Sequence, residues 1–238
     1  MALTPSIMTP LGSPAPDFGL PDTEGRRVAL ADFAEAPALL VVFMCNHCPY
    51  VIHVADELAR LARDYRPRGL AMVGINSNDV ESHPADSPAK MRDEVAARGY
   101  EFAYLFDATQ AVARAYNAAC TPDFFLFDAD RKLVYRGQLD ESRPGNGVPV
   151  TGHDLRAAIE ALLLAARGAT HHDTSLGLFA DGFVASACST PGTAALRLRA
   201  LAENPGARSR AGLRHGLLGE PPSTKQVPSM GCNIKWRR

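Results

Sequence analysis

The sequence of 238 residues lacks the features that mark several classes of protein. It contains no uninterrupted apolar run of about 18 residues, which a membrane-spanning helix would need. Its formal net charge is −1, so the whole molecule gives no electrostatic reason to expect nucleic acid or an anionic membrane as a partner. Its N-terminus has no basic start followed by an apolar stretch. We therefore expect no secretory signal and a cytoplasmic location.

The sequence also lacks an even number of cysteines, so its cysteines cannot all pair within one chain. The five are Cys45, Cys48, Cys120, Cys188 and Cys232. In a chain without a secretory signal, cysteines are more often catalytic, metal-binding or simply buried than part of a disulfide framework.

Charge is distributed unevenly along the chain. Residues 1–166 contain 15 basic and 22 acidic residues, whereas residues 167–224 contain six and four, and residues 225–238 contain four and none. Residues 167–224 also have few large apolar side chains. We therefore expect a folded domain over 1–166 and a flexible insertion over 167–224, with a small structured subdomain as the alternative for the insertion. We expect the segment 225–238, which holds the only tryptophan, to pack back on the core.

Hydrophobic periodicity predicts alternating strands and helices within the first 166 residues. The continuous apolar run over 38–44 is typical of a strand that is buried on both faces. Helical spacing follows Pro49, and a polar loop is expected over 76–86. Further strands are expected at 18–20, 27–30, 70–75, 102–106, 124–127 and 132–136, and further helices at 87–99, 109–117 and 153–166. Helices that alternate with buried strands predict an α/β layered sheet.

Cys45-Asn46-His47-Cys48 is a CxxC motif at the junction of the buried strand and the helix after Pro49. Exposed N–H groups at a helix N-terminus stabilise a thiolate, which is the nucleophilic form of cysteine. We expect Cys45 to lie at the very start of the helix, to be the more exposed cysteine and to attack a disulfide. Cys48, one turn further, would then resolve the mixed disulfide. His47 would stabilise the thiolate further when protonated.

Two other interpretations of the CxxC motif are open. The motif supplies half of a zinc site, and Cys120 and Cys232 could add two ligands, although their spacing is unlike that of a zinc ribbon. The two cysteines could also be inert core residues. Redox chemistry is favoured over both interpretations, and we expect no metal and no cofactor.

The order strand, CxxC, helix and a distant Thr121-Pro122 that opens a β-hairpin resembles the thioredoxin fold. The segments FMCNHCPYV, TPDFFLFD, YRGQLD and PSMGCNIKW resemble, more narrowly, the peroxiredoxin-like branch of the alkyl hydroperoxide reductase/thiol-specific antioxidant (redoxin) superfamily. The resemblance implies a thioredoxin-like fold, with a central mixed β-sheet flanked by helices and an irregular insertion before the C-terminal segment. It also implies a cis Pro122 against the CxxC motif, with the Thr121 backbone available to pair with a substrate strand.

Departures from the patterns of these families weaken parts of the resemblance. Peroxiredoxins use a P-x-x-x-T-x-x-C pattern, and alignment on Cys48 puts Val41 at the proline position and Cys45 at the threonine position. The groups that position and polarise a peroxide are therefore missing. Leu39 stands where thioredoxin has a buried aspartate, so no acid/base group for Cys48 is identified.

The sequence thus predicts a thiol–disulfide oxidoreductase that acts through Cys45 and Cys48 on a protein or small-molecule disulfide or thiol. An unidentified thiol would serve as reductant, and no nucleic acid or membrane partner is expected. One alternative is a peroxiredoxin-like thiol peroxidase, an antioxidant that uses Cys48. The other is a redox-inactive or metal-carrying binding module. The candidate neighbours of the cysteine pair are Asn46, His47, Pro49, Thr121 and Pro122, and the candidate auxiliary thiols are Cys120 and Cys232.

Overall fold

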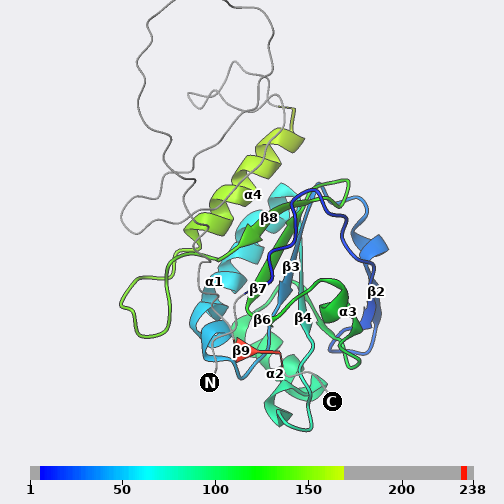
Figure 1. Ribbon diagram of the computed structural model, residues 1–238, viewed down its shortest axis with the longest axis vertical. Helices are drawn as coiled ribbons and strands as arrows, with labels where there is room; N and C mark the ends of the chain where they lie inside the picture. The colour runs from blue at the N-terminus through cyan, green and yellow to red at the C-terminus, as the bar shows by residue number, and fades with distance from the viewer. Residues whose placement is uncertain (1–5, 169–231, 235–238) are drawn as a thin grey trace, which may run out of the picture.

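The computed structural model describes residues 6–168 and 232–234 (Figure 1). A five-stranded sheet runs through its centre in the order β5-β4-β3-β7-β8. Neighbours β3, β4 and β5 are parallel, whereas β7 is antiparallel to both β3 and β8, so the sheet is mixed as predicted. The strands are β3 (Ala38–Phe43), β4 (Leu70–Asn76), β5 (Ala103–Phe106), β7 (Asp123–Phe127) and β8 (Leu133–Gly137).

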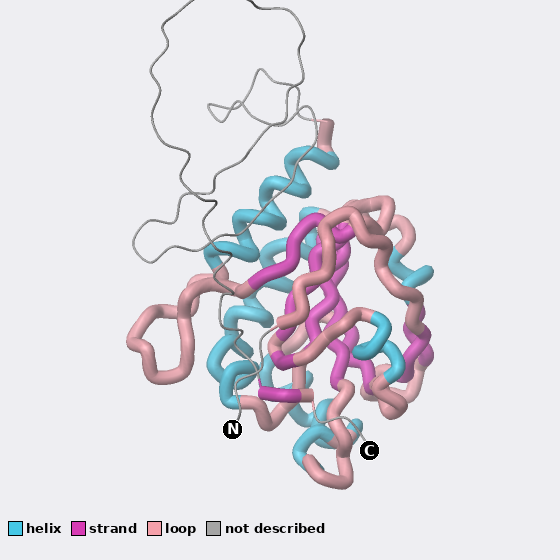
Figure 2. The backbone as a smooth tube through the Cα atoms, in the orientation of Figure 1, coloured by secondary structure: helices cyan, strands magenta, loops and turns pink. Residues whose placement is uncertain are grey.

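Helices cover both faces of the sheet (Figure 2). Three of them, α1 (Pro49–Tyr65), α2 (Pro88–Arg98) and α4 (His153–Ala166), contribute buried side chains to one core cluster. The opposite cluster contains side chains of α3 (Ala111–Ala115) and of the N-terminal hairpin formed by β1 (Gly19–Pro21) and β2 (Arg27–Ala29). The described residues also include three short 3-10 helices: η1 (Leu30–Phe33), η2 (Arg66–Arg68) and η3 (Pro84–Asp86).

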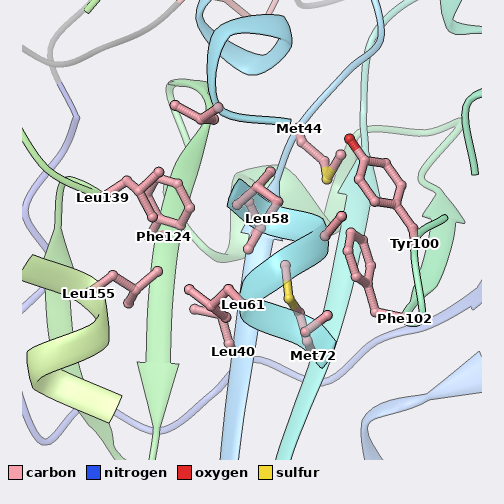
Figure 3. Close-up of a cluster of buried hydrophobic side chains, with 14 of the residues drawn as sticks. Leu40, Met44, Leu58, Leu61, Met72, Tyr100, Phe102, Phe124, Leu139 and Leu155 are labelled. Carbon is pink, nitrogen blue, oxygen red and sulfur yellow. The ribbon is translucent and has the colours of Figure 1, made fainter. Parts of the chain in front are cut away.

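Strand β3 is central because both of its faces are apolar. Leu40 and Val42 point into the cluster beneath α1 and α4, which Figure 3 shows, whereas Leu39 and Val41 belong to the opposite cluster. Successive side chains of a strand point to opposite faces, so a continuous apolar run contributes side chains to both core clusters. The strand expected from the sequence is thereby confirmed.

The other predicted elements are present, with small differences at their ends. Helix α2 begins at Pro88 behind Ser87 and ends at Arg98, before Gly99, whose φ of +64° is a conformation that glycine adopts without a steric penalty. Helix α3 is shorter than expected. No helix among the described residues is long and apolar enough to cross a membrane.

Two short strands were not expected from the sequence. Strand β6 (Cys120–Thr121) pairs antiparallel with β9 (Cys232–Asn233), in the register Cys120 to Asn233 and Thr121 to Cys232. The pairing continues with a hydrogen bond from the Ile234 N–H to the Ala119 carbonyl at 3.3 Å. Ile234 is 3% exposed and belongs to the core cluster on the α3 side of the sheet. Part of the C-terminal segment therefore packs on the folded domain.

The structure describes most of the expected domain over 1–166 but little of the two segments expected after it. The expected insertion over 167–224 lies outside the described residues except for Arg167 and Gly168. Of the segment 225–238, only residues 232–234 are described, and both Cys188 and Trp236 lie outside.

A buried ion pair holds the start of β7 beside β8. The Asp123 carboxylate accepts two hydrogen bonds from the Arg136 guanidinium, one of them at 2.8 Å, and a third from the Ser6 hydroxyl at 2.8 Å. Both charged side chains are at most 1% exposed. Burial raises the pKa of Asp123, although the Arg136 charge and the hydrogen bonds oppose that shift. Because Asp123 directly follows Pro122, this pair fixes the backbone next to the cysteines.

We expect Arg136→Met to lower the free energy of unfolding by about 3–5 kcal/mol, because it leaves a buried carboxylate without its partner. Urea unfolding followed by circular dichroism measures this loss. Arg66→Met is the matched control: it breaks an ion pair with Glu101 on the surface and should cost less than about 1 kcal/mol. Equal losses in the two variants would contradict a structural role for the Asp123–Arg136 pair.

Candidate active site

The CxxC motif forms the connection between β3 and α1. The Met44 N–H still donates to the Ile75 carbonyl of β4 at 2.9 Å, so the sheet positions the chain up to Cys45. Cys48 is the N-cap of α1, with extended backbone angles, and Pro49 is the first helical residue. Pro49 suits this position because its ring fixes φ near the helical value and it has no N–H to leave unpaired.

This geometry corrects the expectation for the two cysteines. The helix begins at Pro49, so Cys45 lies three residues before the N-cap, and Cys48 is the cysteine at the helix N-terminus. Cys45 is also not the more exposed of the two, because both residues are 0% exposed. The reason is the extended conformation of Cys48, which delays the first helical turn.

Thr121 lies against both cysteines. The peptide bond between Thr121 and Pro122 is cis, which confirms the isomer that the resemblance implied. The Thr121 hydroxyl is 3.4 Å from the Cys45 Sγ, and the Cys48 Sγ is 3.2 Å from the Thr121 carbonyl, to which it donates when it is protonated. One residue therefore contacts both thiols through its side chain and its backbone.

Cys232 reaches the same point from the C-terminal segment. It is the register partner of Thr121 in the β6–β9 pair, and its thiol is a hydrogen-bond partner of the Cys48 thiol. Cys232 is 6% exposed. The Cys48 sulfur thus has two other thiols, those of Cys45 and Cys232, as hydrogen-bond partners.

The surroundings of Cys48 favour its thiolate. The hydrogen bond from the Cys45 thiol has the largest effect on the pKa of Cys48. Together with the hydrogen bonds from Cys232, Thr121 and the Val51 backbone, it outweighs burial and lowers that pKa to about 5. The Val51 N–H is one of the groups that the first turn of a helix leaves without an internal partner.

The surroundings of Cys45 and Cys232 favour their protonated forms. The hydrogen bond that Cys45 gives to Cys48, together with burial and the nearby Asp86 charge, raises the pKa of Cys45 well above its usual value. Burial and the hydrogen bond to Cys48 raise the pKa of Cys232 to about 12. These shifts favour a negative charge on Cys48 over one on Cys45 or Cys232.

Asp86 anchors the loop between the two cysteines. Its carboxylate accepts hydrogen bonds from the Asn46 N–H at 2.8 Å, the His47 N–H at 3.3 Å and the Asn78 side chain at 3.0 Å, and contacts the His47 Nδ1 at 2.6 Å. Burial opposes ionisation of this carboxyl, but the hydrogen bonds and the His47 ring outweigh burial and lower the pKa of Asp86. Asp86 is therefore a fixed negative charge beside Cys45.

Sequence reasoning missed Asp86 and Tyr104. Tyr104 donates to the Asn46 side chain at 3.0 Å, and Asn46 in turn donates to the Ala85 carbonyl at 2.8 Å. A signal was present, because Asp86 ends the polar loop that follows β4. The carboxyl ends of parallel neighbours such as β3 and β4 meet at one edge of a sheet, which is where the CxxC motif lies.

The other candidate residues have distinct positions. Cys120 is buried, with its Sγ 3.4 Å from the Ser6 hydroxyl.

Cys45, His47 and Asp86 place one ligand atom each within 4.8 Å of one another, so these three side chains could hold a metal ion. The contact between the His47 ring and the Asp86 carboxylate also accounts for this arrangement without a metal ion.

Comparison with known proteins identifies the family. A model of the redoxin family matches residues 10–155, and the chain belongs to that family. Among curated proteins, it is similar to a 1-Cys peroxiredoxin B of Oryza sativa subsp. indica, 26% identical over 66% of each chain. It is also similar to the thiol-disulfide oxidoreductase ResA of Bacillus subtilis, 25% identical over 55% of this chain and 70% of that protein. The predicted family is thereby confirmed.

Solved structures agree on the fold. An uncharacterised conserved protein from Geobacillus kaustophilus is 54% identical, with a TM-score of 0.68 over 69% of this chain and 88% of that chain. The thioredoxin domain of a thiol-disulfide oxidoreductase from Bacteroides vulgatus is 19% identical, with a TM-score of 0.52 over 66% of this chain and 99% of that chain. The fold is thioredoxin-like, as predicted.

We expect absorbance at 240 nm, which reports thiolates, to rise in the reduced protein as the pH increases through about 5. Below that pH Cys48 is a thiol, and above it Cys48 is a thiolate. Cys48→Ser should remove this step. Cys45→Ala should move the step to higher pH, because it removes the main hydrogen-bond donor to the thiolate. A step that persists in Cys48→Ser would show that another cysteine is the acidic thiol.

Proposed function

We propose that this redoxin-family chain is a thiol–disulfide oxidoreductase in which Cys48 attacks the substrate and Cys45 resolves the product. The observation that carries the proposal is the Cys48 sulfur, which lies at the N-terminus of α1 and accepts hydrogen bonds from two thiols. A relative named for this activity supports it. The pair is that expected from the sequence, with the two roles exchanged.

In the first step the Cys48 thiolate attacks one sulfur of a substrate disulfide. A bond forms between Cys48 and that sulfur, the substrate S–S bond breaks, and the other half of the substrate leaves as a thiolate. A cysteine with a lowered pKa is suited to this step because it is ionised at neutral pH. Since Cys48 is fully buried, the step requires a local opening of the structure around it.

In the second step Cys45 resolves the mixed disulfide. Cys45 loses its proton and attacks the Cys48 sulfur, which forms the Cys45–Cys48 disulfide and releases the rest of the substrate as a thiolate. The proton passes to the His47–Asp86 pair, whose nitrogen and oxygen atoms lie within 4.8 Å of the Cys45 sulfur. These residues would thus supply an acid/base group for Cys45, whereas the sequence left such a group for Cys48 unidentified. An external thiol then reduces the disulfide by the same two steps in reverse.

Serine variants of the two cysteines test the roles. In a Cys232→Ser background, Cys45→Ser should accumulate a stable adduct at Cys48 when it reacts with oxidised glutathione, because no resolving thiol remains. Cys48→Ser in the same background should form less than about 1% of that adduct, because the protonated Cys45 is a poor nucleophile.

Intact mass spectrometry after acid quenching, followed by peptide mapping, locates the adduct. The background variant with both Cys45 and Cys48 present is the control, and it should pass to the internal disulfide without accumulating the adduct. An adduct on Cys45 in the Cys48→Ser variant would return the attacking role to Cys45.

A second candidate function is a thiol peroxidase. The same Cys48 thiolate could attack a hydroperoxide, giving a sulfenic acid and an alcohol, and Cys45 could then condense with the sulfenic acid and release water. A relative named as a peroxiredoxin supports this candidate. However, the groups that lower the pKa of Cys48 are two thiols, Thr121 and a backbone N–H, and none of them brings a positive charge to a peroxide oxygen.

Reaction rates of the reduced protein distinguish the two candidates. We expect the second-order rate constant for loss of the Cys48 thiolate to be at least about tenfold larger with a disulfide probe, 5,5′-dithiobis(2-nitrobenzoate), than with hydrogen peroxide, because the site activates sulfur but not a peroxide oxygen. Stopped-flow measurements at pH 7 give both constants, with Cys48→Ser as the blank. A larger constant for peroxide would favour the peroxidase.

A further inference from the structure

The C-terminal strand is placed where it contacts the reacting sulfur. Thr121 contacts both cysteines of the CxxC motif, and β9 pairs with the strand that contains Thr121. Register places Cys232 opposite Thr121, and residues that are opposite in an antiparallel pair have Cα atoms about 4.5–5.5 Å apart. Burial of Ile234 in the core fixes the segment just beyond Cys232.

We propose that Cys232 is a third redox-active thiol, which exchanges with the Cys45–Cys48 disulfide to form a Cys48–Cys232 disulfide. The proposal rests on the proposed function, because it needs Cys48 to have been oxidised by a substrate disulfide first. It assigns the C-terminal segment a chemical role in addition to its packing on the fold.

The exchange conserves electrons and needs no further oxidant. Cys232 loses its proton and its sulfur attacks the Cys48 sulfur; the new Cys48–Cys232 bond forms as the Cys45–Cys48 bond breaks. Cys45 leaves as a thiolate and takes up a proton, because its surroundings favour the protonated form. The same attack on a Cys48–substrate mixed disulfide would release the substrate thiol directly.

The state of Cys48 controls when Cys232 can react. Burial holds Cys232 protonated, and the hydrogen bond that it donates to the Cys48 thiolate adds to that effect. Once Cys48 is in a disulfide, its charge and the hydrogen bond to it are gone, so only the other causes, chiefly burial, still raise the pKa of Cys232. Oxidation of Cys48 therefore makes its neighbour more nucleophilic.

Cys120 provides a matched comparison within the same two-stranded pair. It is a buried cysteine that directly precedes Thr121, and its register partner is Asn233. Its sulfur contacts the Ser6 hydroxyl, whereas the hydrogen bonds that lower the pKa of Cys48 come from Cys45, Cys232, Thr121 and the Val51 backbone. We therefore assign the third redox role to Cys232 and use Cys120 as the comparison.

The test uses the full chain with Cys45→Ser, so that the usual resolving thiol is absent. Oxidised glutathione is added to the reduced protein, samples are quenched with acid, and the glutathione adduct and internal disulfides are identified by mass spectrometry without reduction. A tethered thiol has an effective concentration in the millimolar range or above, so the adduct should decay at least about tenfold faster in Cys45→Ser than in Cys45→Ser/Cys232→Ser. A peptide that links Cys48 to Cys232 should appear as the adduct decays.

Two controls test whether the rapid decay depends on the position of Cys232 in the fold. Cys45→Ser/Cys120→Ser should behave like Cys45→Ser, and denaturing urea added before glutathione should abolish the rapid decay, because unfolding removes the β6–β9 pairing. Circular dichroism verifies that each variant is folded before the reaction. In the protein with all five cysteines, the Cys48–Cys232 link should also be detected at equilibrium in a glutathione buffer.

Persistence of the adduct in both Cys45→Ser and Cys45→Ser/Cys232→Ser would overturn the role of Cys232 and leave the proposed function intact. Absence of any adduct or internal disulfide at Cys48 in every variant would overturn the proposed function, and the role of Cys232 with it. Equal loss of the rapid decay on removing Cys120 would also contradict the assignment.

Discussion

The hydrogen bonds that meet at the Cys48 sulfur are the interaction on which the site depends. Four parts of the fold supply them: Cys45 follows β3, the Val51 N–H belongs to the first turn of α1, Thr121 lies in β6, and Cys232 lies in β9. Three of these parts are positioned by contacts outside the site. The central sheet positions β3, the buried Asp123–Arg136 pair fixes the backbone after Thr121, and the buried Ile234 holds the segment that contains Cys232.

Cys45 and Cys48 differ in their acidity because their electrostatic surroundings differ. On the Cys48 side, N–H and S–H donors point at the sulfur, and a helix N-terminus favours negative charge. On the Cys45 side, the Asp86 carboxylate is a fixed negative charge that disfavours a second thiolate. The arrangement stabilises the state in which Cys48 is ionised and Cys45 is protonated, which is the starting state for attack by one thiol and resolution by the other. Burial of both residues strengthens these interactions, because little water is present to screen them.

The fold could be predicted largely from the sequence, because its signals are local. The apolar run of β3, the helical spacing after Pro49 and the Ser87-Pro88 start of α2 each depend on neighbouring residues. The chemistry of the two cysteines could not be predicted, since their pKa values depend on which thiol donates a hydrogen bond to the other and on contacts from distant segments. The contribution of Asp86 requires knowing which loop lies beside the CxxC motif. The β6–β9 pairing joins segments far apart in the chain, and strands of two residues leave no detectable periodicity.

In the reduced protein at neutral pH, we infer that the Cys45–Cys48 pair holds one thiolate and one thiol. The reduction potential of the pair, measured between pH 6 and pH 8 in glutathione buffers, distinguishes this state from a pair of thiols. If one thiolate and one thiol are produced, two electrons are taken up with one proton, and the potential should fall by about 30 mV per pH unit. A fall of about 59 mV per pH unit would mean that both cysteines are protonated on reduction, and it would rule out a stable thiolate in the pair.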